Sequence, residues 1–302
     1  MTVRIYRSTD ASAPVLSGTA GALVGVLDAC LVTGYGSNVA AGWAKSYSGT
    51  NKAAYRQPAG SNQFYLRVDD TGAQEVRLVG YEAMSGVDTG TGPFPTSAQQ
   101  SGGLYAYKSL AASAAARPWV LVTNGKIFYL FTAVDGTTFS QGWAFGDPVS
   151  YKPGDAYHTI IIGGAVAGVN ASQLASVVSQ LSSAVTGHYQ ARAYTQVGSS
   201  ITLGNHTDGV KYTGAVAGSG GMSYPTLPDG ALWFAPLWLH EPSNSCLRGE
   251  LPGLFVPLHI KPLSNGDTFT GSGAYAGKTF EAVMVNGGAN QGQLFFETSD
   301  TW

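Results

Sequence analysis

The stretch WVLVTNGKIFYLFTAV, Trp119–Val134, decides the fold class because it contains two strand-like runs joined by a short turn. Both runs are rich in β-branched and aromatic residues, which favour strands. Asn124-Gly125 stands between them, and this dipeptide is the strongest short-range indication of a two-residue hairpin turn. The stretch therefore predicts an antiparallel hairpin in a mainly β protein.

Strand-like segments continue on both sides of this hairpin. Upstream lie an opening strand at Val3–Tyr6, a predicted hairpin over 52–70 and a strand over 75–84. Downstream lie Trp143–Val149 and Tyr157–Ile162, and from Tyr189 onward short strands alternate with turns. This many short strands of varied length, with long Gly/Ser-rich loops such as 214–228, favours sandwich-like sheets over a closed barrel.

Two segments have a helical pattern. Over about 17–33, apolar residues recur every three or four positions, as on one face of a helix. Ser17 or Thr19 is expected to cap its start and Gly34 to end it. The segment 172–186 has a similar apolar face. We therefore expect an N-terminal β-rich domain (1–165), a helical connector (166–187) and a C-terminal β-rich domain (188–302).

Charge is scarce in this chain. Charged residues are 11% of the sequence, against about 25% in an ordinary soluble domain. The net charge is −2, and Lys and Arg are scattered, so the clustered cations that nucleic-acid binding needs are missing. Two interpretations stay open. Either much of the surface is buried against other subunits, or a loop-rich β protein is covered by uncharged polar residues.

The N-terminus, MTVRIYRSTDASAP, lacks the apolar core of a secretory signal. The most apolar stretch, Leu23–Val32, is too short to cross a membrane, so no membrane insertion is expected. Cys30 and Cys246 have no motif spacing, and both are expected to be reduced. These observations predict a protein that is made in the cytoplasm and either stays there or is assembled there into something larger.

Motifs for catalysis are weak. The sequence has no GxSxG elbow and no P-loop, and Asp69 and Asp70 would point to opposite faces of a strand. Zinc-type ligands occur at His240-Glu241, Glu250 and His259, but the local sequence HEPSNS lacks the second His of the HExxH zinc motif. A weak cation site is the other candidate, formed by His206 and Asp208. We therefore expect no enzyme activity, no catalytic residue, no metal and no cofactor.

Aromatic residues raise a different hypothesis, a surface on which carbohydrate rings stack. Such residues more often fill cores and subunit contacts, so both interpretations stay open. The candidates are Phe94, Tyr105, Tyr107, Trp143, Tyr151, Tyr224, Trp233 and Trp238.

The segment RGELPGLFVPLHIKPLSNGDTF, Arg248–Phe269, contains Pro252, Pro257 and Pro262 at intervals of five residues. Proline is excluded from central strands, so this spacing favours a sheet edge or an extended arm. Its apolar residues would then need a partner subunit, unless the segment is an edge strand packed within its own chain. The predicted interface residues are Arg248, Glu250, Leu254, Phe255, Val256 and His259.

Three stretches together carry a resemblance to a known family. They are 16–56 (LSGTAGALVGVLDACLVTGYGSNVAAGWAKSYSGTNKAAYR), 117–136 with 143–157 (RPWVLVTNGKIFYLFTAVDG, WAFGDPVSYKPGDAY), and 247–283 with the terminal ETSDTW. The chain resembles virion structural proteins encoded in the tail region of tailed bacteriophages and prophages of proteobacteria. The resemblance spans nearly the whole chain and implies a place in the particle, not a reaction.

The resemblance implies a structural component of a phage tail in the tail tip or baseplate. It would form a symmetric homo-oligomeric ring, trimeric or hexameric, between tube, hub and fibre proteins. Its location would be the virion, after assembly in the bacterial cytoplasm. The alternatives are a receptor-binding module for a host-surface glycan or pilus, a head decoration or head–tail connector protein, and, ranked last, a polysaccharide hydrolase.

Overall fold

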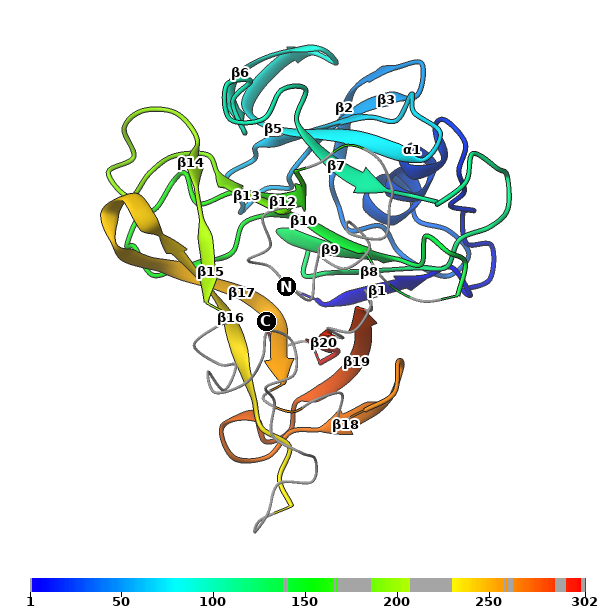
Figure 1. Ribbon diagram of the computed structural model, residues 1–302, viewed down its shortest axis with the longest axis vertical. Helices are drawn as coiled ribbons and strands as arrows, with labels where there is room; N and C mark the ends of the chain where they lie inside the picture. Colours follow the sequence, from blue (N-terminus) through cyan, green and yellow to red (C-terminus); the bar gives the residue numbers. More distant parts are fainter. Residues whose placement is uncertain are drawn as a thin grey trace.

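The computed structural model describes residues 2–137, 139, 141–165, 167, 186–206, 230–257, 259, 263–285, 292–299 and 302. These residues form a mainly β protein with two antiparallel sheets, which confirms the predicted fold class. The larger sheet has 13 strands and is curled into a half-barrel, and the smaller sheet has 7 strands (Figure 1).

The larger sheet runs in space from β1 at one end to β2 at the other. Its order is β1 (Arg4–Arg7), β8 (Trp119–Thr123), β9 (Ile127–Thr132), β10 (Gln141–Gly146), β12 (Ile160–Gly164), β7 (Leu104–Tyr107), β5 (Glu75–Gly86), β4 (Tyr65–Asp69), β3 (Lys52–Arg56) and β2 (Ala44–Gly49). Three further strands attach to this path, namely β6 (Thr89–Phe94) on β5, β13 (Thr186–Gln190) on β12 and β14 (Ile201–Thr202) on β13.

The smaller sheet combines strands from the C-terminal part of the chain with one short strand from the middle. Its order is β15 (Gly204–His206), β16 (Phe234–Glu241), β17 (Cys246–Pro257), β20 (Gly292–Glu297), β19 (Thr279–Val285) and β18 (Thr268–Thr270), with β11 (Val149–Ser150) paired to β17. The helical elements are α1 (Ala22–Leu27), the π-helical turn η1 (Asp28–Thr33), and the 3₁₀ turns η2 (Pro242–Asn244) and η3 (Gly273–Tyr275).

The predicted hairpin is confirmed as β8 and β9, but its turn is wider than two residues. The last paired residues are Thr123 and Phe128, and β9 begins at Ile127, so the connection between the two strands spans 124–126. The side-chain oxygen of Asn124 accepts hydrogen bonds from the amides of Lys126 and Ile127, at 2.9 and 3.1 Å. Asn side chains often organise turns in this way. Gly125 takes the positive φ, 90°, that a side chain would disfavour.

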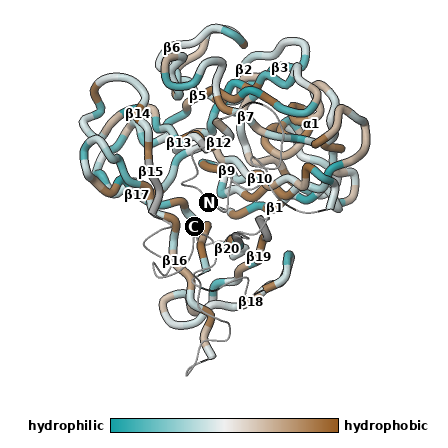
Figure 2. The backbone as a smooth tube through the Cα atoms, in the orientation of Figure 1, coloured by the Kyte–Doolittle hydropathy of each residue, from teal (hydrophilic) through white to brown (hydrophobic). Residues whose placement is uncertain are grey.

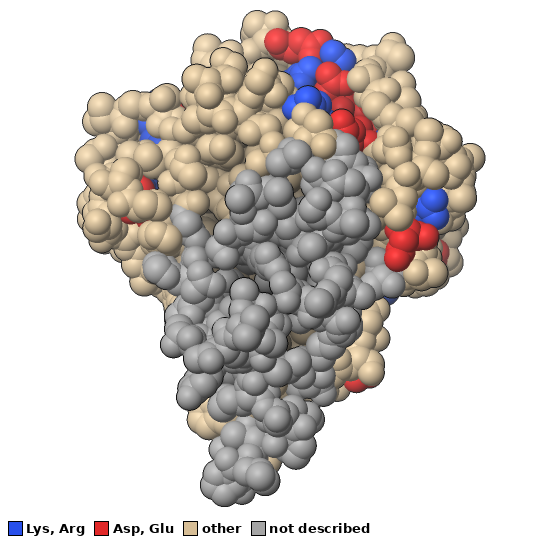
Figure 3. Space-filling view, viewed as in Figure 1, with Lys and Arg blue, Asp and Glu red and all other residues tan. Residues whose placement is uncertain are grey.

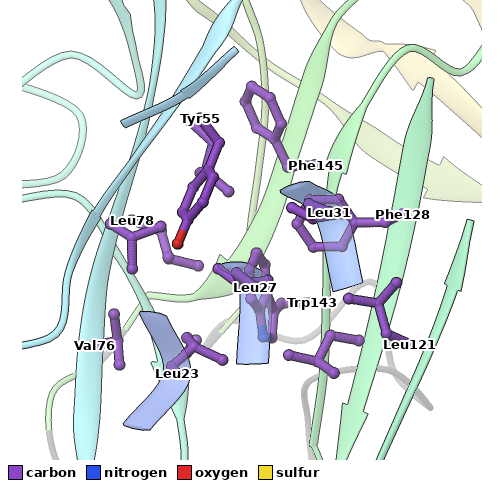
Figure 4. Packing of buried hydrophobic residues seen from close by; sticks show 14 of the residues in the cluster. Leu23, Leu27, Leu31, Tyr55, Val76, Leu78, Leu121, Phe128, Trp143 and Phe145 are labelled. Atoms are coloured by element: carbon purple, nitrogen blue, oxygen red, sulfur yellow. The ribbon is translucent and has the colours of Figure 1, made fainter. Parts of the chain in front are cut away.

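The early helix lies in the concave side of the larger sheet. Its apolar face packs against strands from both arms of the curl (Figure 4). It begins at Ala22, and neither Ser17 nor Thr19 caps it. Instead Asp70, at the end of β4, accepts hydrogen bonds from the amides of Leu23 and Val24, at 2.7 and 3.1 Å.

Asp70 is fully buried and forms an ion pair with the ammonium of Lys108, which is 1% exposed. Lys108 also donates to the carbonyls of Thr19 and Gly72, at 2.7 and 2.9 Å. The helix start therefore depends on a contact between distant parts of the chain. Gly34 ends the helical region with φ 77°, as predicted. Asp69, the neighbour of Asp70, lies elsewhere, with Lys52 and Arg67 near the surface.

The central strands are buried on both faces because the molecule has three layers (Figures 1 and 2). Every residue of β8, β9, β10 and β12 is buried. On one face, Leu121, Phe128 and Phe145 pack around the helix. On the other face, Val122, Tyr129 and their neighbours pack against the smaller sheet. The hairpin therefore belongs to two hydrophobic cores at once.

Strand pairing crosses the domain boundaries expected from the sequence. Strand β13 starts at the end of the expected connector and continues into the expected C-terminal domain, yet it pairs with β12 of the larger sheet. Strand β11 precedes the connector, yet it pairs with β17 of the smaller sheet. The expected connector lies mostly outside the described residues. Cys30 and Cys246 are both free thiols, and Cys30 is buried in the helix core.

His188 on β13 makes stability depend on pH. Its side chain is 4% exposed, and burial lowers the pKa of His188 to about 4, from about 6.5 in an unfolded chain. Between these values the unfolded chain binds a proton that the folded protein does not. The free energy of unfolding is therefore highest above about pH 6.5, and it decreases by up to about 1.4 kcal/mol per pH unit as the pH falls to about 4.

Urea titrations of the wild type and of His188→Gln between pH 7 and 4 measure this effect. We expect the wild type to lose about 2–3 kcal/mol more than the variant over this range. Equal losses in both proteins would contradict the assignment to His188.

Candidate binding surface around strand β17

The predicted interface segment lies mostly inside its own chain. Leu254, Phe255, Val256 and His259 are 2, 6, 8 and 4% exposed, so they do not await a partner. The edge-strand interpretation is also wrong, because β17 is a central strand that pairs with β16, β20 and β11. This part of the sequence prediction is therefore corrected: the apolar triplet is core.

A bulge explains how prolines fit in a central strand. Opposite β16, Pro236 pairs with Phe255 and the next residue, Leu237, pairs with Leu251, so 252–254 have no partner on that side. Prolines inside sheets are confined to such bulges, edges and strand starts. The hydroxyl of Tyr129, from the larger sheet, donates to the carbonyl of Pro252 at 2.9 Å. Pro262 lies outside the described residues.

Gly253 completes the bulge. Its φ is 69°, and a Cβ there would lie 2.3 Å from the ring of Trp302. That ring stacks near Tyr129, with 5.9 Å between the ring centroids. The bulge, Tyr129 and the C-terminal Trp therefore join the two sheets at one point.

Arg248 is the centre of a buried charge network. Its guanidinium is 2% exposed and donates to Glu241 at 2.7 Å and to Asp155 at 2.6 Å. Both carboxylates are buried and accept further hydrogen bonds, from the Tyr194 amide and the Ser150 hydroxyl, each at 2.8 Å. The network ties β16 and β17 to the loop 150–155 and to the loop after β13.

The zinc-type ligands do not come together. Glu241 is held by Arg248, Glu250 accepts a hydrogen bond from Tyr151, and Nε2 of His259 accepts one from the amide of Trp233. Within the described ranges, no group of three or more His, Cys, Asp or Glu side chains is placed to hold a metal ion. The side chains of His206 and Asp208 lie outside the described part.

The structure separates the seven described aromatic candidates into two groups. Phe94, Tyr105, Tyr107 and Trp143 are at most 4% exposed and belong to the interior. Tyr224 lies outside the described residues. Tyr151 and Trp233 are about half exposed, at 46 and 50%, and Trp238 is partly exposed. Only this second group has ring surface that a ligand can reach.

Tyr151 and Trp238 lie on the outer face of the smaller sheet. Trp238 on β16 is paired with Glu250 on β17, which is paired with Val149 on β11. Directly paired residues share a face, so these three side chains form a row across three strands. Leu237, Leu239 and Leu251 point the other way, into the core between the sheets.

We call this surface the β17 patch. It consists of the row Val149, Glu250 and Trp238, together with residues of the segments 151–152 and 194–197. It contains Val149, Tyr151, Lys152, Tyr194, Val197, Trp238 and Glu250. Tyr194 and Val197 are 44 and 74% exposed. Many of the large exposed apolar side chains in the described chain thus gather here.

Polar atoms of the β17 patch are fixed by one another. The Tyr151 hydroxyl donates to a carboxylate oxygen of Glu250 at 2.8 Å. Partial burial, and then the bond to Glu250, raise the pKa of Tyr151 to about 12, so the phenol is neutral at physiological pH. The Lys152 ammonium lies 5.1 Å from the ring centre of Tyr194, and the Arg248 guanidinium 5.8 Å.

Sequence reasoning found Tyr151, Trp238, Arg248 and Glu250 but missed Asp155, Tyr194 and the pairing that joins them. Asp155 follows Pro153-Gly154, a pair typical of turns, and nothing near it in the sequence marks a partner nearly a hundred residues away. Tyr194 follows the expected connector, and no local pattern distinguishes it from a strand residue.

No protein-family model matches the chain, and no curated protein matches its sequence. Within the described residues, no helix has the length and hydrophobicity that a membrane crossing requires.

Arg248→Met tests whether Arg248 is a structural residue. The variant leaves two buried carboxylates without their cation, and breaking a buried ion pair typically costs about 3–5 kcal/mol. We expect a loss of that size in the free energy of unfolding, measured by urea titration. Glu250→Gln, a change at an accessible residue two positions away, should cost less than about 1 kcal/mol. Equal stability of Arg248→Met and wild type would show that the network is unimportant to the fold.

Proposed function

We propose that the chain is a structural component of a phage tail, in the tail tip or baseplate. There it forms a symmetric homo-oligomer that links tube or hub proteins to fibres. The resemblance of three long stretches to tail-region virion proteins suggests the place. The distribution of charge on the folded chain is the observation that carries the proposal.

A minority of the few charges of this protein lies inside it. The sequence has 16 Lys and Arg and 18 Asp and Glu. Eight of them are buried within the described part of the chain, namely Asp70, Lys108, Asp147, Asp155, Glu241, Arg248, Glu281 and Glu297. Several pair with one another or with a partly exposed partner, as Arg7 does with Glu281 and Lys278 with Glu297.

The described surface is poor in charge because the whole chain is, with 11% charged residues. On the face in Figure 3, the charged side chains gather in a few groups, and most of the described surface is uncharged. Removing a charge from water is costly, and interface cores are depleted in charged residues. A surface of this kind can therefore be covered by neighbouring subunits at little electrostatic cost, which suits a component of a large assembly.

The test is to locate the chain in particles of the phage or induced prophage that encodes it. We expect mass spectrometry to find it in purified virions, and cryo-electron microscopy to place it as a ring at the distal end of the tail. A copy number of a few to a dozen per particle fits such a ring. Its absence from virions, or hundreds of copies on the capsid, would exclude the tail assignment.

A further inference from the structure

We propose that the β17 patch is a binding site for a neutral carbohydrate, with Tyr151 and Trp238 as stacking surfaces and Glu250 as the hydrogen-bond acceptor. This inference goes beyond the structural role and does not require it. It uses the two sequence candidates that the fold brings together on one accessible face. The four candidates in the interior take no part.

The ring surfaces suit a sugar. One face of a pyranose presents C–H groups, which pack on aromatic rings, and its edges present hydroxyl groups. Tyr and Trp combine a large apolar body with a polar tip, so they serve where a ligand is apolar on one side and wet on the other. Trp238 and Val149 flank Glu250 from adjacent strands, and the row is about 10 Å wide, two strand spacings.

The polar groups suit hydroxyl donors. One oxygen of Glu250 is taken by Tyr151, and its other oxygen has no hydrogen-bond partner among the described residues. A carboxylate only accepts hydrogen bonds, and a hydroxyl that donates to it makes a strong, charge-assisted bond. The Tyr151 hydroxyl is already committed to Glu250, so it fixes the position of the acceptor.

Charge in and under the patch argues against an anionic ligand. Arg248, beneath Tyr194, is neutralised by two buried carboxylates. Lys152 is the one Lys or Arg in the patch as defined, and Glu250 offsets it. A polyanion such as nucleic acid would need several free cations. A neutral sugar requires none.

The patch is held rigid before any ligand arrives. The Arg248 network anchors β16, β17 and both loops, and the side chain of Gln196 donates to the carbonyl of Gly154 at 3.1 Å, joining one loop to the other. Preorganised groups lose less entropy on binding. A rigid, shallow surface with a few aromatic rings is compatible with weak binding at each copy, which a multi-copy assembly strengthens by avidity.

The experiment uses the purified full chain and a panel of neutral mono- and oligosaccharides built from glucose, galactose, mannose and N-acetylglucosamine. Saturation-transfer NMR detects binding, and tryptophan fluorescence gives the Kd. The variants are Tyr151→Ala, Trp238→Ala and Glu250→Gln. Tyr81→Ala, at a partly exposed tyrosine of the larger sheet, is the matched control. Tyr151→Phe keeps the ring if Tyr151→Ala does not fold.

We expect at least one neutral sugar to bind the wild type, and Tyr151→Ala and Trp238→Ala each to weaken it about tenfold. Glu250→Gln should weaken it about threefold or more, and Tyr81→Ala should leave it unchanged. No binding at millimolar sugar, or binding that survives both aromatic variants, would overturn the proposal. So would an oligomer in the wild type that Tyr151→Ala dissociates, since the patch would then be a protein contact. None of these results depends on where the chain lies in a virion.

Discussion

Two-sided burial of the β8–β9 hairpin is the constraint on which the structure depends. Leu121, Phe128 and Leu130 face the helix, while Val120, Val122 and Phe131 face the smaller sheet. Each fully buried side chain of this type contributes roughly 1.5–3 kcal/mol. Neither core is complete without the hairpin, so the curled sheet, the helix it encloses and the smaller sheet are organised around it.

The position of the β17 patch follows from this arrangement. Strand β11 and the loop after β13 extend from segments next to the larger sheet, and they meet β16 and β17 only because the smaller sheet is packed against the hairpin. The Arg248 network is a buried group of charges that joins β16 and β17 to Asp155, in the loop after β11. The same arrangement accounts for the gathering of aromatic side chains in one place.

Strand and hairpin patterns predicted the mainly β class and the β8–β9 pairing, and helical periodicity followed by a glycine predicted the end of the early helix at Gly34. They could not predict the cap by Asp70, because that contact joins residues far apart in the sequence. The proline spacing in β17 was misinterpreted as an edge for a related reason. A bulge that tolerates Pro252 depends on Tyr129 and Trp302, and no pattern within β17 reports them. Local sequence patterns identified strands and the helix, whereas contacts between residues far apart in the sequence determined what each of these packs against.

Native-state hydrogen exchange tests most directly whether the hairpin joins both sheets into one cooperative unit. The amides of β8 and β9 report on the hairpin, and those of β17 and β20 report on the smaller sheet. The account predicts that both groups exchange only through global unfolding, with opening free energies equal to that from urea titration. Exchange of β17 and β20 at a much lower free energy than β8 and β9 would show that the smaller sheet opens alone, and would contradict a shared core.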